Sequence, residues 1–159
     1  MDYRTAASGV SDYLIETRRR IHRRPELSGQ EAETAAFIRW ELAKLNIPYE
    51  EIGFNTIGRL ELGDGKKVAV RADIDALPIE EQTDVPWKSE IPGKMHACGH
   101  DGHTAILLAL AKLMSENREA FSGTVYFCFQ SGEERGLGAK ECVEYLKEQG
   151  GVDRVMGLH

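Results

Sequence analysis

Strand-like and helix-like segments alternate along the second half of this sequence, and this alternation most constrains how the chain can fold. Residues 67–72, 124–130 and 154–158 have the character of strands, and helical segments at 103–116 and 138–149 separate them. A β-α-β-α-β order is typical of parallel strands joined by right-handed crossovers. We therefore predict an α/β fold with a mostly parallel sheet flanked by helices on both faces. The apolar runs of the last two strands predict that both are buried.

Two helices and a hairpin are predicted before this alternation begins. Residues 10–24 form a basic helix, whose charges we expect to be solvated or paired with acids elsewhere. Ser28 and Glu31 have the spacing of a capping box, so a second helix should begin there. Residues 57–62 alternate as a strand, and a short glycine-rich turn leads into strand 67–72. This arrangement predicts a β-hairpin at one side of the sheet.

The composition is that of an ordinary folded protein with an acidic balance. The chain has 159 residues, of which 42% are hydrophobic and 29% charged, and its formal net charge is −6. An acidic balance argues against nucleic acid as a partner. The longest apolar run, residues 105–111, is far shorter than the roughly 20 residues that a membrane span needs. We therefore expect neither nucleic acid nor a membrane as a partner.

Cysteine usage and the first residues indicate a reducing compartment. No apolar segment or cleavage signature of a secretory signal follows Met1. The cysteines are odd in number and far apart, at Cys98, Cys128 and Cys142, which is unlike a disulfide framework. We expect a cytoplasmic protein in which Cys128 and Cys142 are core residues.

Acidic or imidazole side chains follow each strand of the predicted parallel sheet. In chain order they are Asp73, Asp75, Glu133, Glu134 and His159. Ligands of open α/β sheets bind outside the carboxyl ends of the strands. Each group has a common structural use when taken alone, as a turn cap, a helix-terminal acid or a frayed end. Their convergence at one edge of the sheet outweighs those uses and predicts a functional site there.

The segment that leads into helix 103–116 contains the densest group of metal-binding residue types. Within eight residues it carries His96, Cys98, His100, Asp101 and His103. Thiolate, imidazole and carboxylate are transition-metal ligands, and the two glycines of this segment allow tight backbone bends. The segment therefore predicts a metal site. A nucleophilic role for Cys98 is the alternative, but His100 and the nearby acids suit a metal better.

Five segments of the chain together resemble a known family, the metallopeptidase-related amidohydrolases. This family includes N-acyl-amino-acid amidohydrolases, hippurate hydrolases, N-acetyldiaminopimelate deacetylases and auxin-conjugate hydrolases. The segments are residues 19–28, 71–78, 95–104, 129–134 and 157–159. The third contains the run Cys-Gly-His-Asp-Gly-His, which is highly specific, and the resemblance covers essentially the whole chain.

This resemblance implies a two-metal hydrolase that acts on the amide bond of N-acyl amino acids. The implied metal ligands are Cys98, His100, Glu134 and His159. By the same resemblance, Glu133 is the general base and Asp75 orients a ligand, whereas Asp73 lies beside the site in a role that stays open. The implied cofactors are two divalent ions, of zinc, manganese, cobalt or nickel, and the implied full-length protein is a homodimer.

The chain departs from the family pattern in two places. Ser131 and Gly132 precede the glutamate pair where the family commonly has Pro-Ala, so the conformation of that loop is open. A further histidine ligand, a lid or dimerisation domain and a C-terminal catalytic segment are absent from these residues. We therefore expect residues 1–159 to be the N-terminal portion of the catalytic domain of a metallo-amidohydrolase.

Four functions stay open on the sequence alone. The first is hydrolysis of N-acyl amino acids, and the second is a dipeptidase or carboxypeptidase activity on the same scaffold. The third is an inactive fragment that binds metal, because one ligand and the lid are missing. The fourth is a redox or metal-sensing module built on Cys98, which no paired Cys-x-x-Cys motif supports.

Overall fold

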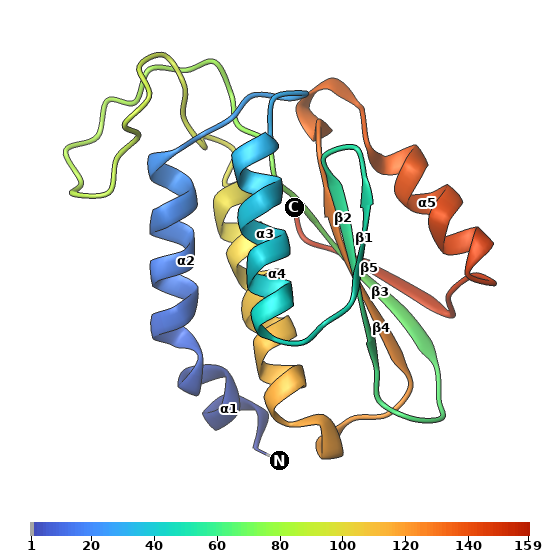
Figure 1. Cartoon of the computed structure of the whole chain (residues 1–159). Coiled ribbons are helices and arrows are strands. Elements are labelled where there is room, and N and C mark those ends of the chain that lie inside the picture. The colour runs from blue at the N-terminus through green and yellow to red at the C-terminus, as the bar shows by residue number, and fades with distance from the viewer. Residues whose placement is uncertain (1) are drawn as a thin grey trace.

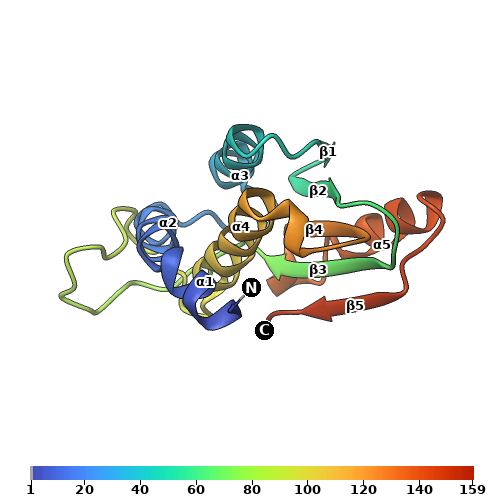
Figure 2. The same cartoon turned by 90° about the horizontal axis from the view of Figure 1, so that it is seen from below.

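A five-stranded mixed sheet forms the centre of the fold, with helices on both of its faces (Figures 1 and 2). The structure is a computed structural model that describes residues 2–159. In spatial order the strands are β1 (Tyr49–Ile52), β2 (Asn55–Glu61), β4 (Thr124–Gln130), β3 (Lys67–Asp73) and β5 (Arg154–Gly157). Strands β4, β3 and β5 are parallel, whereas β2 runs antiparallel to β4, and β1 antiparallel to β2.

The helices divide between the two faces of this sheet. They are α1 (Tyr3–Gly9), α2 (Ser11–Arg23), α3 (Ala32–Lys44), α4 (His100–Glu116) and α5 (Ala139–Glu148). The first four lie on one side of the sheet and α5 lies on the other (Figure 2). The predicted α/β class, with helices on both faces and a parallel set of strands, is confirmed. Among residues 2–159, no helix combines the length and the apolar character needed to cross a membrane.

Strand β4 explains why the sheet needs helices on both sides. Its side chains alternate, so Phe127 and Phe129 pack with α3 and α4, whereas Tyr126 and Cys128 pack with α5. A strand buried on both faces reads as a nearly continuous apolar run, which is how it reads in the sequence. Cys128 and Cys142 are core residues, as predicted, and burial raises the pKa of the Cys128 thiol to about 12.

The predicted hairpin between residues 57–62 and 67–72 is wrong. Strand β4 lies between β2 and β3 and is hydrogen-bonded to both. The most apolar strand takes this central place because there both its faces and both its edges are buried. The hairpin at the side of the sheet is instead formed by β1 and β2.

The predicted burial of the last strand is also wrong. Strand β5 pairs with β3 alone within the described part of the chain, so it is an edge strand. Val155 and Met156 are 66% and 55% exposed. The apolar sequence therefore predicted strand β5 correctly, but it did not predict that the strand is exposed to solvent.

The capping box predicted at the start of α3 does not form. The side chain of Glu26 instead accepts hydrogen bonds from the backbone N–H groups of Glu33 and Thr34, at 3.0 and 2.7 Å. A carboxylate in that position satisfies amides that the helix leaves unpaired. Ser28 and Glu31 are consequently free to bond elsewhere in the fold.

Helix α4 begins at His100, three residues before the predicted start. Gly99 precedes it with a φ of 101°, a left-handed conformation that favours glycine. The sharp turn places His100 and Asp101 in the first turn of the helix, where both are buried. The conformation of Gly99 thus brings metal-binding residue types onto a rigid element.

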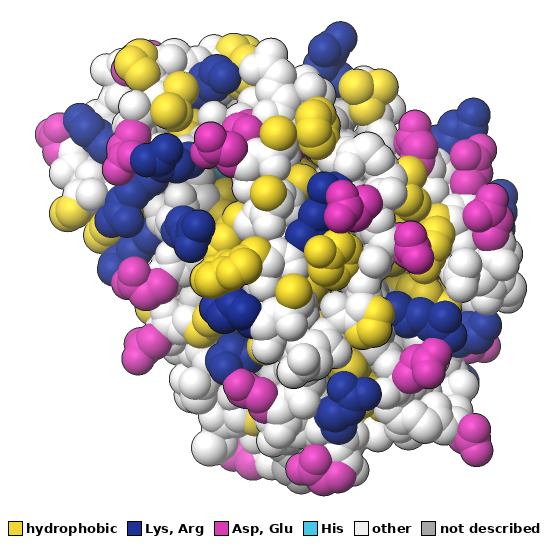
Figure 3. All heavy atoms as spheres, viewed as in Figure 1, with side chains coloured by type: hydrophobic (Ala, Val, Ile, Leu, Met, Phe, Trp, Pro, Cys, Tyr) yellow, Lys and Arg dark blue, Asp and Glu magenta, His cyan; other side chains and the backbone are white. Residues whose placement is uncertain are grey.

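The basic run on α2 is paired rather than fully solvated. Arg18 Nε and His22 Nδ1 both lie 2.7 Å from Asp101 Oδ2, and His22 Nε2 lies 3.2 Å from Glu81 Oε1. Arg20 Cζ lies 4.1 Å from the centre of the Phe37 ring. Figure 3 shows Lys and Arg side chains interspersed with Asp and Glu on this face. These contacts tie α2 to the first turn of α4, to Glu81 in the long loop between β3 and α4, and to α3.

His22 should make the stability of the protein depend on pH. The hydrogen bond to Asp101 raises the pKa of His22, although burial opposes that rise. A histidine whose pKa is raised by folding stabilises the fold below its unfolded pKa of about 6.5. That contribution is lost as the pH rises through the folded pKa. We expect the free-energy advantage of the full-length wild type over His22→Gln to shrink between pH 6 and pH 9.

Chemical denaturation of both proteins at each pH measures this difference, and Gln is suitable because it stays neutral throughout. A difference in unfolding free energy that does not change with pH would show that His22 does not titrate against Asp101.

Candidate metal centre

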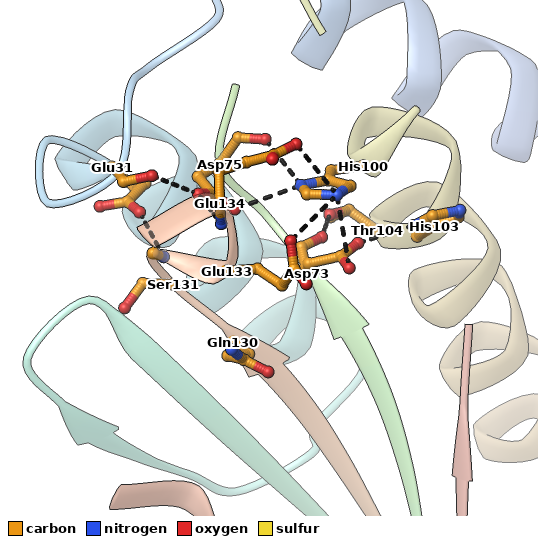
Figure 4. Close-up of polar contacts among 12 residues, drawn as sticks. Glu31, Asp73, Asp75, His100, His103, Thr104, Gln130, Ser131, Glu133 and Glu134 are labelled. Atoms are coloured by element: carbon orange, nitrogen blue, oxygen red, sulfur yellow. Dashed lines mark hydrogen bonds and ion pairs between the residues drawn. The ribbon is translucent and has the colours of Figure 1, made fainter. Parts of the chain in front are cut away.

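The site lies where the carboxyl ends of β3 and β4 meet the first turn of α4 (Figure 4). Asp73 is the last residue of β3, and Asp75 follows it in the loop. Glu133 and Glu134 begin a short 3₁₀ turn, Glu133–Arg135, after β4. The two loops and the helix bring side chains from three parts of the chain around the ring of His100.

His100 is fully buried at the centre of this group. Its Nδ1 lies 3.0 Å from the carbonyl oxygen of Asp75 and 3.2 Å from Oδ1 of that residue, so Nδ1 carries the proton. Its Nε2 lies 3.5 Å from Asp73, 3.8 Å from Glu133 and 3.7 Å from Glu134, and it finds no hydrogen-bond partner within residues 2–159. A bare nitrogen lone pair facing three carboxylates suits a shared cation, so these residues fit a divalent metal.

Asp75 holds His100 in this orientation. Its Oδ2 accepts hydrogen bonds from Ser28 Oγ at 2.5 Å and from the backbone N–H of Glu134 at 3.0 Å. Burial acts to raise the pKa of Asp75, but its hydrogen bonds to His100, Ser28 and Glu134 outweigh burial and lower the pKa to about 2. Asp75 is therefore ionised at neutral pH and fixes both the tautomer and the direction of the imidazole.

Two overlapping groups of residues bring possible ligand atoms within 4.8 Å of one another. The first group is Cys98, His100 and His159, and the second is Asp73, His100, Glu133 and His159. Three of the four expected ligands thus come together directly. The fourth, Glu134, belongs to neither group, although its Oε1 lies 3.7 Å from His100 Nε2. His159 Nε2 lies 3.9 Å from Glu133 Oε1.

The surroundings of Cys98 bear on whether its thiol binds metal or attacks substrate. Burial, the charge of Glu134 and a hydrogen bond with Glu134 all raise the pKa of Cys98. A cysteine nucleophile requires the opposite shift, because the thiolate is the reactive form. A divalent ion would supply the positive charge that this position needs for a thiolate.

Ser131 and Gly132, which stand where the family commonly has Pro-Ala, make specific contacts in the loop that carries Glu133 and Glu134. We call this loop the glutamate loop. The backbone N–H and Oγ of Ser131 both donate to Asn55 Oδ1, at 2.8 and 3.0 Å. A proline at position 131 would have no N–H for the first bond. Gly132 has a φ of 67°, and a Cβ there would lie 2.8 Å from Cβ of Leu137. The loop conformation thus depends on both residues.

Sequence reasoning assigned no role at the site to Arg71, Ser28 or Glu31. Asp73 accepts from Arg71 Nη1 at 2.8 Å and contacts His103 Nδ1 at 2.7 Å. Ser28 and Glu31 lay in or beside a segment that resembles the family, but their spacing also fits a capping box. Local spacing could not show that both side chains point away from their own helix.

Comparison with known proteins identifies the family. The chain belongs to peptidase family M20/M25/M40, whose sequence model matches residues 69–159. The family resemblance drawn from the sequence is therefore confirmed.

Relatives of this chain include hydrolases of amides and of peptides. IAA-amino acid hydrolase ILR1-like 5 of Arabidopsis thaliana is 47% identical over 150 residues, covering 93% of this chain and 34% of that protein. Thermostable carboxypeptidase 2 of Saccharolobus solfataricus is 45% identical over 156 residues, covering 94% of this chain and 39% of that protein. The chain thus spans between a third and two fifths of the length of these curated relatives.

A solved structure shares the same fold over the full chain. The YxeP protein of Bacillus subtilis, a dinuclear metal binding peptidase from the M20 family, superposes with a TM-score of 0.85 at 40% sequence identity. The match covers 100% of this chain and 44% of that one.

Proposed function

We propose that this chain supplies most of the metal site and the general base of a metal-dependent amidohydrolase. The reaction is hydrolysis of the amide bond of an N-acyl amino acid, which releases a carboxylic acid and an amino acid. The observation that carries this proposal is the unpaired Nε2 of buried His100, which faces three carboxylates. The high identity to an IAA-amino acid hydrolase supports an amide of an amino acid as substrate.

The proposed ligands of two divalent ions are Cys98, His100, Glu134 and His159. Zinc suits thiolate and imidazole, whereas manganese, cobalt and nickel also suit mixed sites with carboxylates. Bound divalent ions supply Lewis-acid chemistry, lowering the pKa of water toward neutrality and polarising a carbonyl oxygen. Asp75 orients His100 toward this site through Nδ1.

Glu133 is the proposed general base. Its two carboxylate oxygens lie 3.8 Å from His100 Nε2 and 3.9 Å from His159 Nε2, and its side chain stays 28% exposed. It can therefore meet a substrate that enters from solvent. Glu133 takes a proton from the attacking water as the new C–O bond forms, and it passes that proton to the leaving amine as the C–N bond breaks.

We propose that residues 1–159 are the N-terminal portion of the catalytic domain of a longer cytoplasmic homodimer. The missing ligand, lid and C-terminal catalytic segment would then come from the rest of that protein. The three free cysteines, Cys98, Cys128 and Cys142, support a reducing compartment.

A dipeptidase or carboxypeptidase activity is the second candidate, and the similarity to a thermostable carboxypeptidase favours it. The decisive assay gives the purified full-length protein N-acetyl and N-benzoyl amino acids, dipeptides and acyl peptides, with zinc or manganese added. Faster turnover of N-acyl amino acids supports the first proposal, and faster turnover of dipeptides supports the second. Metal binding without turnover of any substrate would favour a non-catalytic metal-binding protein.

Cys98→Ala tests the ligand assignment. Loss of the thiol should lower the metal content of the full-length protein before it affects the fold, because Cys98 is exposed. Elemental analysis after dialysis against a weak chelator measures the bound metal. Cys128→Ala is the matched control, since that thiol is buried in the core against α5 and belongs to neither group of possible ligands. Metal content that is unchanged in Cys98→Ala would count against ligation.

A further inference from the structure

The segment that joins α2 to α3 reaches across the fold to the loop that carries Glu133. Glu31 is fully buried there, and its Oε1 accepts a hydrogen bond of 2.7 Å from the backbone N–H of Gly132. Figure 4 shows Glu31 on the far side of Asp75 and Glu134 from His100. The carboxylate of Glu31 thus supports the glutamate loop from behind and does not face the site itself.

Glu133 lies between two backbone amides that are each held by a buried carboxylate. The N–H of Gly132 donates to Glu31 at 2.7 Å, and the N–H of Glu134 donates to Asp75 at 3.0 Å. Charge-assisted hydrogen bonds of this kind are among the stronger ones in proteins. Neither acceptor is near Glu133 in sequence, so the tertiary fold fixes the backbone on both sides of this residue.

Gly132 is also the point where the loop turns. Its left-handed φ of 67° begins a tight turn in which the N–H of Leu137 donates to its carbonyl oxygen at 2.8 Å. Because the turn after Gly132 is hydrogen-bonded internally, a change at Gly132 shifts the segment that follows. The hydrogen bond that Gly132 donates to Glu31 is therefore made at the residue where the turn begins.

We propose that Glu31 is a positioning residue, which fixes Gly132 and thereby holds the carboxylate of Glu133 in place for proton transfer. This inference rests on the proposed function. The second oxygen of Glu31 finds no hydrogen-bond partner among the described residues, whereas its first oxygen accepts the bond from the Gly132 amide. Burial raises the pKa of Glu31, and the charge of Asp75 adds to that rise. Burying a carboxylate with one unpaired oxygen costs free energy of desolvation. The presence of Glu31 in this buried position beside the loop fits a positioning role.

The first test is Glu31→Ala in the full-length protein with N-acyl amino acid substrate. We expect kcat to fall about 10- to 100-fold, as for a reacting group displaced by about 1 Å, with KM within about twofold. The amount of bound metal should stay at the wild-type level, because the N–H of Glu134 still donates its hydrogen bond to Asp75. Glu31→Gln can accept the same bond from Gly132 and should restore most of kcat. Glu26→Ala is the matched control, since it removes a carboxylate that caps α3 and should lower the thermal midpoint without changing kcat.

The second test asks whether Glu31 acts through Glu133. In a Glu133→Gln background, Glu31→Ala should cause no further loss of residual turnover, since the group it positions is already gone. A loss of equal size in both backgrounds, or a fall in stability with unchanged kcat, overturns the inference. Should Glu31→Ala fail to fold, Glu31→Leu fills the space without an acceptor and takes its place.

Hydrogen exchange separates failure of this inference from failure of the proposed function. Backbone amides in residues 131–136 should exchange faster in Glu31→Ala than in wild type or Glu31→Gln, whether or not the protein hydrolyses amides. A wild type without amidase activity refutes the proposed function, and the exchange result still decides whether Glu31 holds the loop. Unchanged exchange in Glu31→Ala overturns the positioning role.

Discussion

Glu133→Gln is expected to lower kcat by about 100- to 10,000-fold, the usual range for removal of a general acid–base group. The amide of glutamine has nearly the same shape as the carboxylate, but it cannot take a proton from water. The ligands assigned to the metals are other residues, so bound metal should stay close to the wild-type level. Steady-state kinetics and elemental analysis on the same full-length preparation measure both quantities.

Glu144→Gln provides the control for this substitution. Glu144 is an exposed residue of α5, on the opposite face of the sheet from α4, so its change should leave kcat unaltered. Turnover by Glu133→Gln within tenfold of wild type would show that another group is the base. A parallel loss of metal would instead indicate that Glu133 is a ligand, which its place in a group with Asp73, His100 and His159 makes a specific alternative.

The parallel part of the fold could be predicted because its signals are local. Strand β4 is apolar from residue 125 to residue 129, and the helices between the strands have the length of crossovers, so order and handedness follow from general rules. The edge where Asp73, Glu133 and His159 meet follows from the same rules, since parallel strands end at one edge. Sequence alone therefore predicts the edge of the sheet at which these side chains lie.

The parts that were mispredicted depend on contacts between distant segments. A glycine-rich turn between β2 and β3 indicates a hairpin, but β4 enters between the two strands because its burial outweighs a local turn preference. Ser28 and Glu31 have capping-box spacing, but neither side chain caps α3. The hydroxyl of Ser28 donates a hydrogen bond to Asp75, and the carboxylate of Glu31 accepts one from the N–H of Gly132. These partners lie 47 and 101 residues away in sequence, where no periodicity can reveal them.

Asp75→Ala is expected to weaken both the fold and the metal site. Asp75 is buried and accepts hydrogen bonds from Ser28 Oγ, the N–H of Glu134 and His100 Nδ1. Removing one partner from a buried, charged network typically costs about 3–5 kcal/mol of unfolding free energy. Loss of the group that orients a metal-binding histidine typically lowers metal affinity about 10- to 100-fold. Chemical denaturation of the metal-free protein and metal titration of the full-length enzyme measure the two effects separately.

Asp75→Asn should separate these two effects. The carboxamide keeps the shape of the side chain but has one acceptor oxygen where the carboxylate has two. The N–H of Glu134 cannot accept a hydrogen bond, so the amide oxygen should face Glu134 and Ser28, leaving the NH₂ group against His100 Nδ1. The fold should then lose less free energy than in Asp75→Ala, while metal affinity falls nearly as far. Metal affinity that is retained in Asp75→Asn would mean that the backbone carbonyl of residue 75, 3.0 Å from Nδ1, orients His100 without help from the side chain.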